Sequence, residues 1–300
     1  MKKMYHNPVL LEACLEGLAL KESGTYVDVT FGGGGHTKAI LDAIGNDGKV
    51  IAFDQDEDTI ENSWEDERLI FIHQNFRYLQ RFLRFHKIDK VDGILADLGV
   101  SSHQIDTPNR GFSIRFDGPL DMRMSSSQGI TAKEVISSYT KEQLIDIFYQ
   151  YGELTNARKI ASRIVESREE SPIETTLELT DLLRPLVPVK TQQKVLAQIF
   201  QALRIEVNKE LEALKSLLRQ SAEVLTHKGR LCVISYHSLE DRLVKRFIQY
   251  GCFENEAEKD EFGRSYMPLK KVGNMSLPKD IEIQNNKRAR SAKLRIAEKI

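Results

Sequence analysis

The chain has 300 residues, 41% of them hydrophobic, and can therefore bury one large core or two modest ones. Its 43 basic and 44 acidic side chains give a net charge of -1, which argues against indiscriminate phosphate binding and confines any nucleic-acid role to a local basic face. The sequence contains no run of 18 apolar residues and no signal-peptide pattern, so we expect a soluble, cytoplasmic protein without membrane contact.

The first hundred residues alternate between helical and strand patterns. The periodicity predicts helices at 9–18, 37–44, 58–64 and 78–85, and strands at 25–29, 49–53, 69–73 and 93–96. An alternation of this kind indicates a parallel sheet covered by helices. The predicted fold class is therefore α/β and Rossmann-like.

Four consecutive glycines, Gly32 to Gly35, follow the first predicted strand. Without Cβ atoms, this segment can turn sharply and lie against a bound molecule. Asp54 ends the next strand about twenty residues later, the spacing at which a carboxylate accepts hydrogen bonds from both ribose hydroxyls. Neither G-x-G-x-x-G nor G-K-[ST] is present, which disfavours a nicotinamide dehydrogenase and a P-loop enzyme. S-adenosyl-L-methionine, which has a ribose but no phosphate, fits this pattern best.

After the fourth predicted strand, the spacing of apolar residues changes from the alternation of strands and helices to a continuous helical pattern. Apolar positions recur every three or four residues over 134–203, which predicts helices, and strand character returns at 230–236 after a helix at 208–225. We therefore predict a cofactor-binding domain made of residues 1–106 and 208–300. A helical domain, residues 107–207, is inserted between strands four and five.

The C-terminal segment and the cysteines complete the pattern. Residues 285–299 are basic and alternate between polar and apolar from Ser291 to Ala297, which predicts an edge strand with 264–272 as its hairpin partner. Cys14, Cys232 and Cys252 are widely spaced without C-x-x-C, and the seven His residues form no H-x-x-x-H or H-E-x-x-H pair. We predict neither a disulfide framework nor a metal site.

Four further segments carry a family resemblance. They are Asp97-Leu98-Gly99-Val100-Ser101-Ser102, Arg110-Gly111-Phe112-Ser113, residues 117–124 (DGPLDMRM) and residues 235–242 (SYHSLEDR). Together they resemble the bacterial 16S ribosomal RNA (cytosine-N4)-methyltransferase family, and the resemblance runs from His6-Asn7-Pro8 to Arg288-Ala289-Arg290-Ser291. It implies a class I methyltransferase sheet with an inserted helical domain. It also implies methyl transfer from S-adenosyl-L-methionine to the N4 amine of a cytidine in the decoding region of the small ribosomal subunit.

The resemblance also implies site residues. Its motifs place cofactor contacts at Gly34, Gly35, His36, Asp54, Phe76, Asp97 and Gln104. Asp97 has two open roles: it either holds the methionine amine of the cofactor or accepts the proton that N4 loses. The chain departs from the family pattern at His103, at Leu154 and over Lys194 to Phe200. The last departure puts a basic contact between the helical domain and RNA in question.

The residues that hold the base and the RNA backbone are less defined. The [DNS]-P-P-[YFW] motif that stacks the base in many related enzymes is absent after strand four, so Phe112, Phe116 and Tyr236 are the candidate platforms. Ser101, Ser102 and His237 are candidate partners of the cytosine edge, although a structural role explains His237 equally well. Candidate phosphate contacts are Arg110, Arg115, Arg123, Lys287, Arg288, Arg290 and Lys293.

Two other functions stay open at this point. One is a methyltransferase acting on a small molecule or a protein, which would not bind small-subunit particles. The other is a ribosome-assembly factor that binds ribosomal RNA with little turnover. The identity of the modified cytidine, the choice between naked RNA and the assembled subunit, and the existence of a homodimer are open as well.

Overall fold

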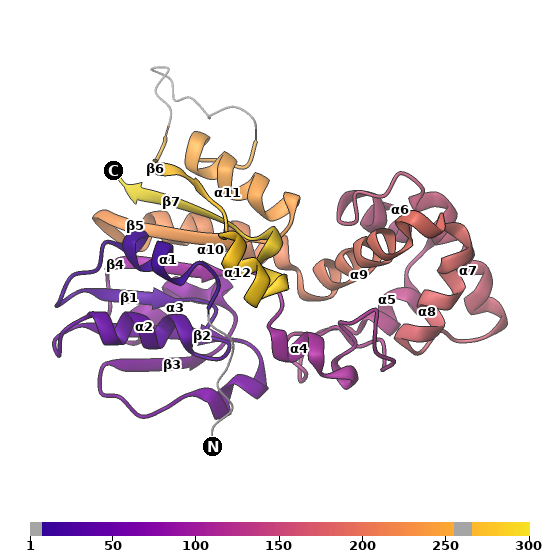
Figure 1. Ribbon diagram of the computed structural model, residues 1–300, viewed down its shortest axis with the longest axis horizontal. Coiled ribbons are helices and arrows are strands. Elements are labelled where there is room, and N and C mark those ends of the chain that lie inside the picture. Colours follow the sequence, from indigo (N-terminus) through magenta and orange to yellow (C-terminus); the bar gives the residue numbers. More distant parts are fainter. Residues whose placement is uncertain (1–7, 255–265) are drawn as a thin grey trace. The chain divides into compact units, whose positions relative to one another are not determined.

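The structure, a computed structural model, describes residues 8–254 and 266–300. The chain divides into two compact units, Met1–Gly99 with Leu211–Ile300, and Val100–Glu210. The first unit is built from two parts of the chain that lie far apart in sequence and share one sheet (Figure 1). The second unit is helical.

The sheet of the first unit has seven strands in the order β3-β2-β1-β4-β5-β7-β6. The strands are β1 (Thr25–Asp28), β2 (Lys49–Asp54), β3 (Leu69–His73), β4 (Val91–Asp97), β5 (Leu225–Ser235), β6 (Leu269–Ser276) and β7 (Lys293–Lys299). β1 to β5 pair in parallel, whereas β7 is antiparallel to both β5 and β6. The predicted Rossmann-like class I methyltransferase sheet is confirmed. Because the strand order reverses between β1 and β4, a ligand crevice is expected at their carboxyl ends.

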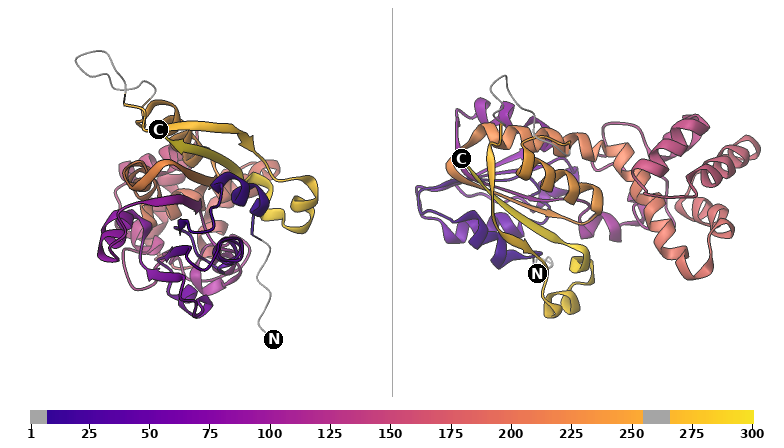
Figure 2. Two further views of the ribbon diagram at one scale, coloured as in Figure 1. Left: turned by 90° about the vertical axis from the view of Figure 1, so that its left-hand side faces the viewer. Right: turned by 90° about the horizontal axis from the view of Figure 1, so that it is seen from above.

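Helices cover both faces of this sheet (Figure 2). Successive strand residues point to opposite faces: in β1, Tyr26 packs with the helices on one side and Val27 with those on the other. The first side has α1 (Leu11–Leu18) and α2 (Gly35–Ala43), and the second has α3 (Leu79–Phe85), α10 (Glu210–Val224) and α11 (Ser238–Tyr250). Burial on both faces explains why the strands read as continuous apolar runs.

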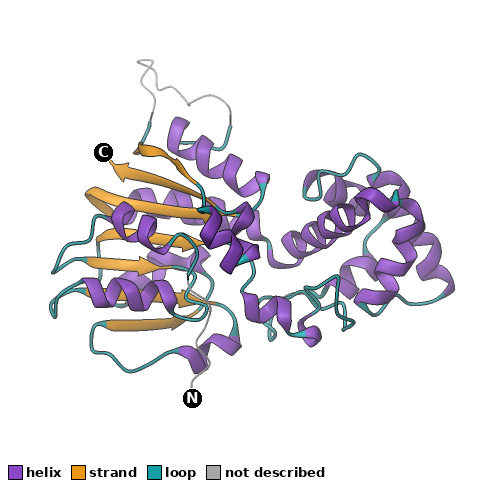
Figure 3. Ribbon diagram, viewed as in Figure 1, coloured by secondary structure: helices purple, strands orange, loops and turns teal. Residues whose placement is uncertain are grey.

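The second unit consists of helices and loops (Figure 3). Its α-helices are α4 (Ser102–Asp106), α5 (Ala132–Ser138), α6 (Lys141–Gln150), α7 (Ala157–Glu170), α8 (Thr176–Leu183) and α9 (Gln192–Asn208). A core of its own includes the fully buried Leu144, Phe148, Ile160, Leu179 and Leu203. α4, α5, α6 and α8 each begin with a capping box, in which a Ser or Thr and a Glu or Gln three residues later satisfy each other's backbone N–H.

Short elements complete the chain. In the first unit they are η1 (Glu57–Asn62), η2 (Phe76–Tyr78), α12 (Asp280–Asn285) and η6 (Lys287–Ser291). In the second unit they are η3 (Pro108–Arg110), η4 (Arg184–Leu186) and η5 (Val189–Thr191). Within the described residues, every helix is too short or too polar to cross a membrane.

Two predictions of local structure are wrong. The segment 58–64 forms no α-helix; its helical part belongs to the 3-10 helix η1, which ends at Asn62. The one apolar residue of η1, Ile60, is 46% exposed, so η1 has no apolar stripe to pack on the sheet. The basic tail is not an edge strand: β7 lies between β5 and β6, with Leu294 and Ala297 fully buried. β6 is the edge and is antiparallel to β7, as a hairpin partner should be. Residues 264 and 265 of the predicted partner lie outside the described part of the chain.

Candidate functional site

A buried carboxylate organises the loop between β1 and α2. Asp28 ends β1 and is fully buried; its Oδ1 accepts the backbone N–H of Thr30 at 3.0 Å, and its Oδ2 accepts the hydroxyl of Thr37 at 2.7 Å. The Thr30 hydroxyl in turn accepts the backbone N–H of Asp97 at 2.7 Å. Asp28 therefore ties the start of α2 and the end of β4 to the glycine loop.

The glycines of this loop serve two purposes. Gly32 and Gly34 have left-handed φ values of 53° and 76°, which favour glycine. A Cβ on Gly34 would lie 2.6 Å from the Trp64 ring, and one on Gly35 would lie 2.5 Å from Pro8, so protein packing alone demands glycine at these positions. A Cβ on Gly32 would have only the Thr30 carbonyl oxygen nearby, at 4.0 Å. The loop is therefore open at Gly32, where a ligand can approach the backbone.

Asp54, at the end of β2, faces the same loop. Its Oδ2 accepts the N–H of Gly32 at 2.7 Å, and its Oδ1 accepts the N–H of Asp56 at 2.9 Å. Burial raises the pKa of Asp54 to about 6, and these two backbone hydrogen bonds oppose the rise. Each oxygen accepts one bond here and has capacity for another. The carboxylate can therefore accept two neighbouring hydroxyls.

Gln55 joins the loops that follow β2 and β3. Its side-chain oxygen accepts a hydrogen bond from the side-chain amide of Asn75 at 2.6 Å. Its backbone carbonyl oxygen lies 3.2 Å from Nε2 of His73. These bonds hold the start of η2, and hence Phe76, next to the loop of Asp54. Phe76 is half-buried and packs against the core of the sheet.

Asp97, at the end of β4, is held by two side chains. The Tyr236 hydroxyl donates to Oδ1 at 2.8 Å, and Nδ1 of His36 lies 3.9 Å from Oδ2. Nε2 of His36 is 3.1 Å from the Val9 carbonyl oxygen, which can only accept, so Nε2 carries a proton. Burial raises the pKa of Asp97 to about 6, while His36 and Tyr236 counteract the rise.

His237 has a structural role at the start of α11. It is the N-cap, and its Nδ1 accepts the N–H of Glu240 at 3.4 Å. The Glu240 carboxylate accepts the backbone N–H groups of Tyr236 and His237 at 2.9 and 3.4 Å. This capping box orients Tyr236 toward Asp97 and leaves the His237 side chain only 9% exposed. The other ring nitrogen of His237, Nε2, lies 3.2 Å from Oε1 of Glu240.

Ser101, Ser102 and Gln104 belong to the helical unit. Ser101 is the N-cap of α4, and its hydroxyl accepts the N–H of Gln104 at 3.1 Å. The Gln104 side-chain oxygen accepts the N–H of Ser101 at 2.9 Å, and Gln104 is 4% exposed. Ser101 and Gln104 thus have local structural partners, and Ser102 is the first residue of α4.

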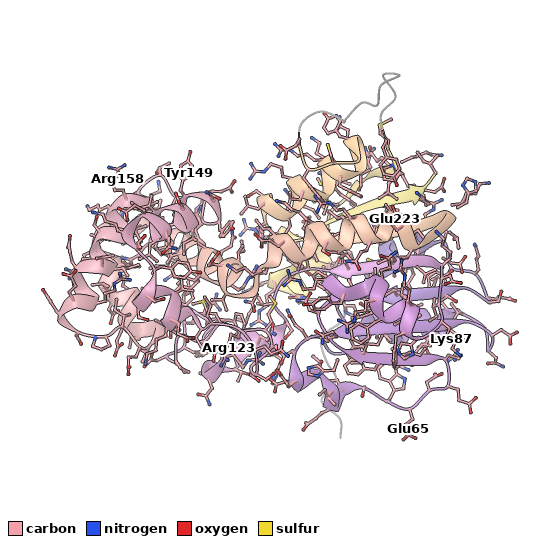
Figure 4. All side chains as sticks on the ribbon, turned by 180° about the vertical axis from the view of Figure 1, so that it is seen from behind. Glu65, Lys87, Arg123, Tyr149, Arg158 and Glu223 are labelled. Carbon is pink, nitrogen blue, oxygen red and sulfur yellow. The ribbon has the colours of Figure 1, made fainter. Side chains whose placement is uncertain are left out.

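Arg110, Phe112 and Arg123 lie together in the helical unit. The Arg110 guanidinium donates to the carbonyl oxygens of Arg123 and Met124 at 3.0 and 2.9 Å and lies 5.9 Å from the centre of the Phe112 ring. Arg123, labelled in Figure 4, forms a two-point pair with Asp121 at 2.9 and 2.7 Å. Both arginines therefore hold their own loop together.

The basic tail divides into two parts. Arg288 and Arg290 are exposed on η6. Lys293 and Arg295, on β7, share the Asp241 carboxylate at 3.7 and 2.7 Å. The exposed positive charge of the tail is therefore concentrated on η6.

The whole sequence matches one family description. The model of the MraW methylase family covers residues 3–300. The chain belongs to this family. Ribosomal RNA small subunit methyltransferase H of Flavobacterium johnsoniae is 57% identical over 296 residues, covering 99% of this chain and 98% of that protein. The protein of the same name from Bacteroides thetaiotaomicron is 52% identical over 296 residues, covering 98% of this chain and 97% of that protein.

Solved structures resemble the chain only distantly. A putative rRNA-methylase from Clostridium thermocellum is 13% identical with a TM-score of 0.45, covering 99% of this chain and 100% of that one. The assignment of the fold rests on the strand order, and membership of the methylase family rests on the sequence.

Sequence reasoning missed three residues that build this site. They are the fully buried Asp28, its partner Thr37 and the link residue Gln55. The role of Asp28 could have been predicted from the sequence, because an acid within an apolar strand must accept hydrogen bonds from buried donors. Thr37 and Gln55 carry no such signal, since their partners are apparent only once the loops are folded.

Proposed function

We propose that this chain transfers a methyl group from S-adenosyl-L-methionine to the N4 amine of a cytidine in the decoding region of small-subunit ribosomal RNA. The observation that carries the proposal is the group of residues at the carboxyl ends of β1, β2 and β4. There an open glycine, Gly32, adjoins the Asp54 carboxylate, and Tyr236 holds Asp97. Membership of the methylase family and the names of its curated relatives support the coarser part of the proposal, methyl transfer to small-subunit ribosomal RNA.

The residues present fit the cofactor. Asp54 has acceptor capacity for the two ribose hydroxyls, and the loop at Gly32 leaves space for a ligand against the backbone. Phe76, on the adjoining loop, offers an apolar contact for adenine. When bound, S-adenosyl-L-methionine supplies an electrophilic methyl group on a sulfonium. We assign the remaining cofactor contacts to Gly34, Gly35, His36, Asp97 and Gln104.

Asp97 would supply the base. The N4 lone pair of cytosine is delocalised into the ring, so this amine is a poor nucleophile. A carboxylate that accepts its N–H draws the nitrogen toward tetrahedral geometry and takes the proton that becomes acidic as the N–C bond forms and the S–C bond breaks. Tyr236 uses one lone pair of Oδ1, and a remaining lone pair of the carboxylate would accept the N4 proton. Orientation and exclusion of water contribute the rest.

The helical unit and η6 would recognise the RNA. We assign Arg288 and Arg290 to phosphate contacts because both are exposed on one short element. Arg110 and Arg123 have protein partners, so they would position Phe112 and their own loop. We assign Ser101, Ser102 and His237 as candidate substrate contacts, and Ser101 and His237 also cap helices.

Transfer of radiolabelled methyl from S-adenosyl-L-methionine to small subunits that lack the modification tests the proposal. N4-methylcytidine on nucleoside analysis is the expected product. Cofactor binding without transfer to subunits or naked RNA would contradict the proposal and favour an assembly factor. Transfer to a protein or a small molecule would favour the other alternative.

Replacement of Asp54 by Ala is expected to weaken S-adenosyl-L-methionine binding by about 1 to 3 kcal/mol, because a ribose diol then lacks its acceptor. Isothermal titration calorimetry measures the change. Lys38→Ala, which removes an exposed pair with Asp42, is the control and should bind normally. Unchanged affinity in Asp54→Ala would show that the ribose lies elsewhere.

A further inference from the structure

The structure separates the three aromatic residues considered as base platforms. Phe112 packs against the core of the helical unit with Arg110 near its ring. Tyr236 is tied to Asp97 through its hydroxyl and packs against the core of the sheet unit. Phe116, in contrast, is 47% exposed, and none of the ring contacts found among the described residues involves it. It is the one candidate with a ring face available to a ligand.

The backbone on either side of Phe116 is anchored. The Phe116 carbonyl oxygen accepts the hydroxyl of Thr176 at 2.9 Å, and that hydroxyl accepts the N–H of Gly118 at 3.2 Å. The Asp117 carboxylate accepts the N–H of Leu177 at 3.2 Å, in the first turn of α8. Thr176 is 1% exposed, so these bonds are part of the packed structure. The exposed Phe116 ring is therefore attached to a backbone segment that hydrogen bonds hold in place.

Two glycines of this loop lie in close backbone contacts. A Cβ on Gly118 would lie 2.0 Å from the Pro108 carbonyl oxygen. Gly111 has a φ of 72°, and a Cβ there would lie 2.2 Å from the Pro119 carbonyl oxygen. Because both positions are glycine, the backbone at Gly118 can pack against Pro108 and the backbone at Gly111 can pack against Pro119. The exposure of Phe116 thus follows from the fold of the loop.

The residue that precedes Phe116 in the sequence, Arg115, is a cation. Arg115 is exposed, and its backbone N–H donates to the buried Ser113 hydroxyl at 3.1 Å. Within residues 8–254 and 266–300, no hydrogen bond or ion pair of the Arg115 guanidinium is found. The neighbouring acid, Asp117, is engaged at the N-terminus of α8, where bonds from Thr175 and Leu177 lower its pKa. An exposed aromatic side chain that adjoins an exposed arginine in the sequence is a combination that binds unpaired nucleotides.

We propose that Phe116 and Arg115 form a contact site for the RNA substrate, in which the ring stacks on an unpaired base and the guanidinium binds the adjacent phosphate. The inference rests on the proposed function, because a base buried in folded RNA must leave its stack to be methylated. A platform that is ordered before binding loses little conformational entropy when the base arrives.

Methylation kinetics with the full chain test this site. Phe116→Ala is expected to raise the KM for small subunits roughly 5- to 150-fold, with kcat and the affinity for S-adenosyl-L-methionine unchanged. Phe116→Trp should restore the KM, because an indole keeps the π face. Arg115→Gln should reduce the slope of log KM against log salt concentration by about one. Tyr149→Ala, another exposed aromatic of the same unit labelled in Figure 4, is the matched control and should behave like the unsubstituted chain.

Phe116→Leu separates stacking from a plain apolar contact. Leucine keeps bulk and hydrophobicity without a π face, so a normal KM in Phe116→Leu would overturn the inference and indicate a protein contact. A normal KM in Phe116→Ala would also overturn it and leave the proposed function intact. If the unsubstituted chain transfers no methyl to RNA, the proposed function fails. Binding of a fluorescein-labelled single-stranded RNA then decides the inference alone: equal affinity of Phe116→Ala and the unsubstituted chain overturns it.

Discussion

Replacement of Asp97 by Asn is expected to lower kcat for methyl transfer roughly 10²- to 10⁴-fold, the contribution of a well-placed general base. The substitution preserves size, and the amide oxygen still accepts the Tyr236 hydroxyl that lies 2.8 Å from Oδ1. What is lost is the ability to take a proton from N4. Single-turnover transfer to small subunits at saturating cofactor measures the chemical step, and calorimetry measures cofactor affinity.

The same variant decides between the two roles of Asp97. A carboxylate that only holds the methionine amine would give a raised Kd for S-adenosyl-L-methionine and a normal kcat at saturation. A base would give a low kcat at saturating cofactor, whether or not the Kd changes. The first result would contradict the mechanism proposed here without removing the proposed reaction.

The pH profile of Tyr236→Phe supplies an independent control. The Tyr236 hydroxyl stabilises the charged form of Asp97, so its loss raises the Asp97 pKa above its present value of about 6. Because transfer requires the ionised carboxylate, the acid limb of kcat should move to higher pH. Other groups that act on this carboxylate or respond to it are His36, Asp28, Glu240 and Cys14. Tyr250→Phe, which removes a hydroxyl bonded to Gln249, should leave the limb in place.

Replacement of Asp28 by Ala is expected to destabilise the sheet unit by about 3 kcal/mol. The change leaves the Thr30 N–H and the Thr37 hydroxyl without their buried acceptor, and each unsatisfied group costs about 1–3 kcal/mol. The chain has one tryptophan, Trp64, which packs beside Gly34 in this unit. Its fluorescence in urea therefore follows the unfolding of the sheet unit.

Thr37→Val is the matched control for Asp28→Ala. It removes a single hydrogen bond to the same carboxylate at nearly constant volume and should cost about 1 kcal/mol. Asp28→Ala should also weaken cofactor binding, since Asp28 anchors the loop at Gly32. A urea midpoint of Asp28→Ala no lower than that of Thr37→Val would contradict the role of Asp28 as the organiser of the loop.

Much of the fold could be predicted from local patterns. The strand predicted at 69–73 coincides with β3, and the predicted strands at 25–29 and 49–53 differ from β1 and β2 by one residue at one end. Apolar runs define these strands because both faces of the sheet are buried. The helices of residues 134–203 were predictable for a similar reason: each has one apolar stripe, and several have a capping box.

The sequence by itself determined the α/β class, the glycine loop, the strand-end acids Asp54 and Asp97, and the presence of a helical insertion, because these depend on periodicity and spacing within short segments. Only the tertiary structure decided that Tyr236, 139 residues from Asp97, holds its carboxylate. It also placed β7 inside the sheet, gave Arg123 a protein partner and left Phe116 exposed. The physical reason is that the partner of a polar or aromatic side chain is set by which distant segments pack together, and no local pattern records that choice.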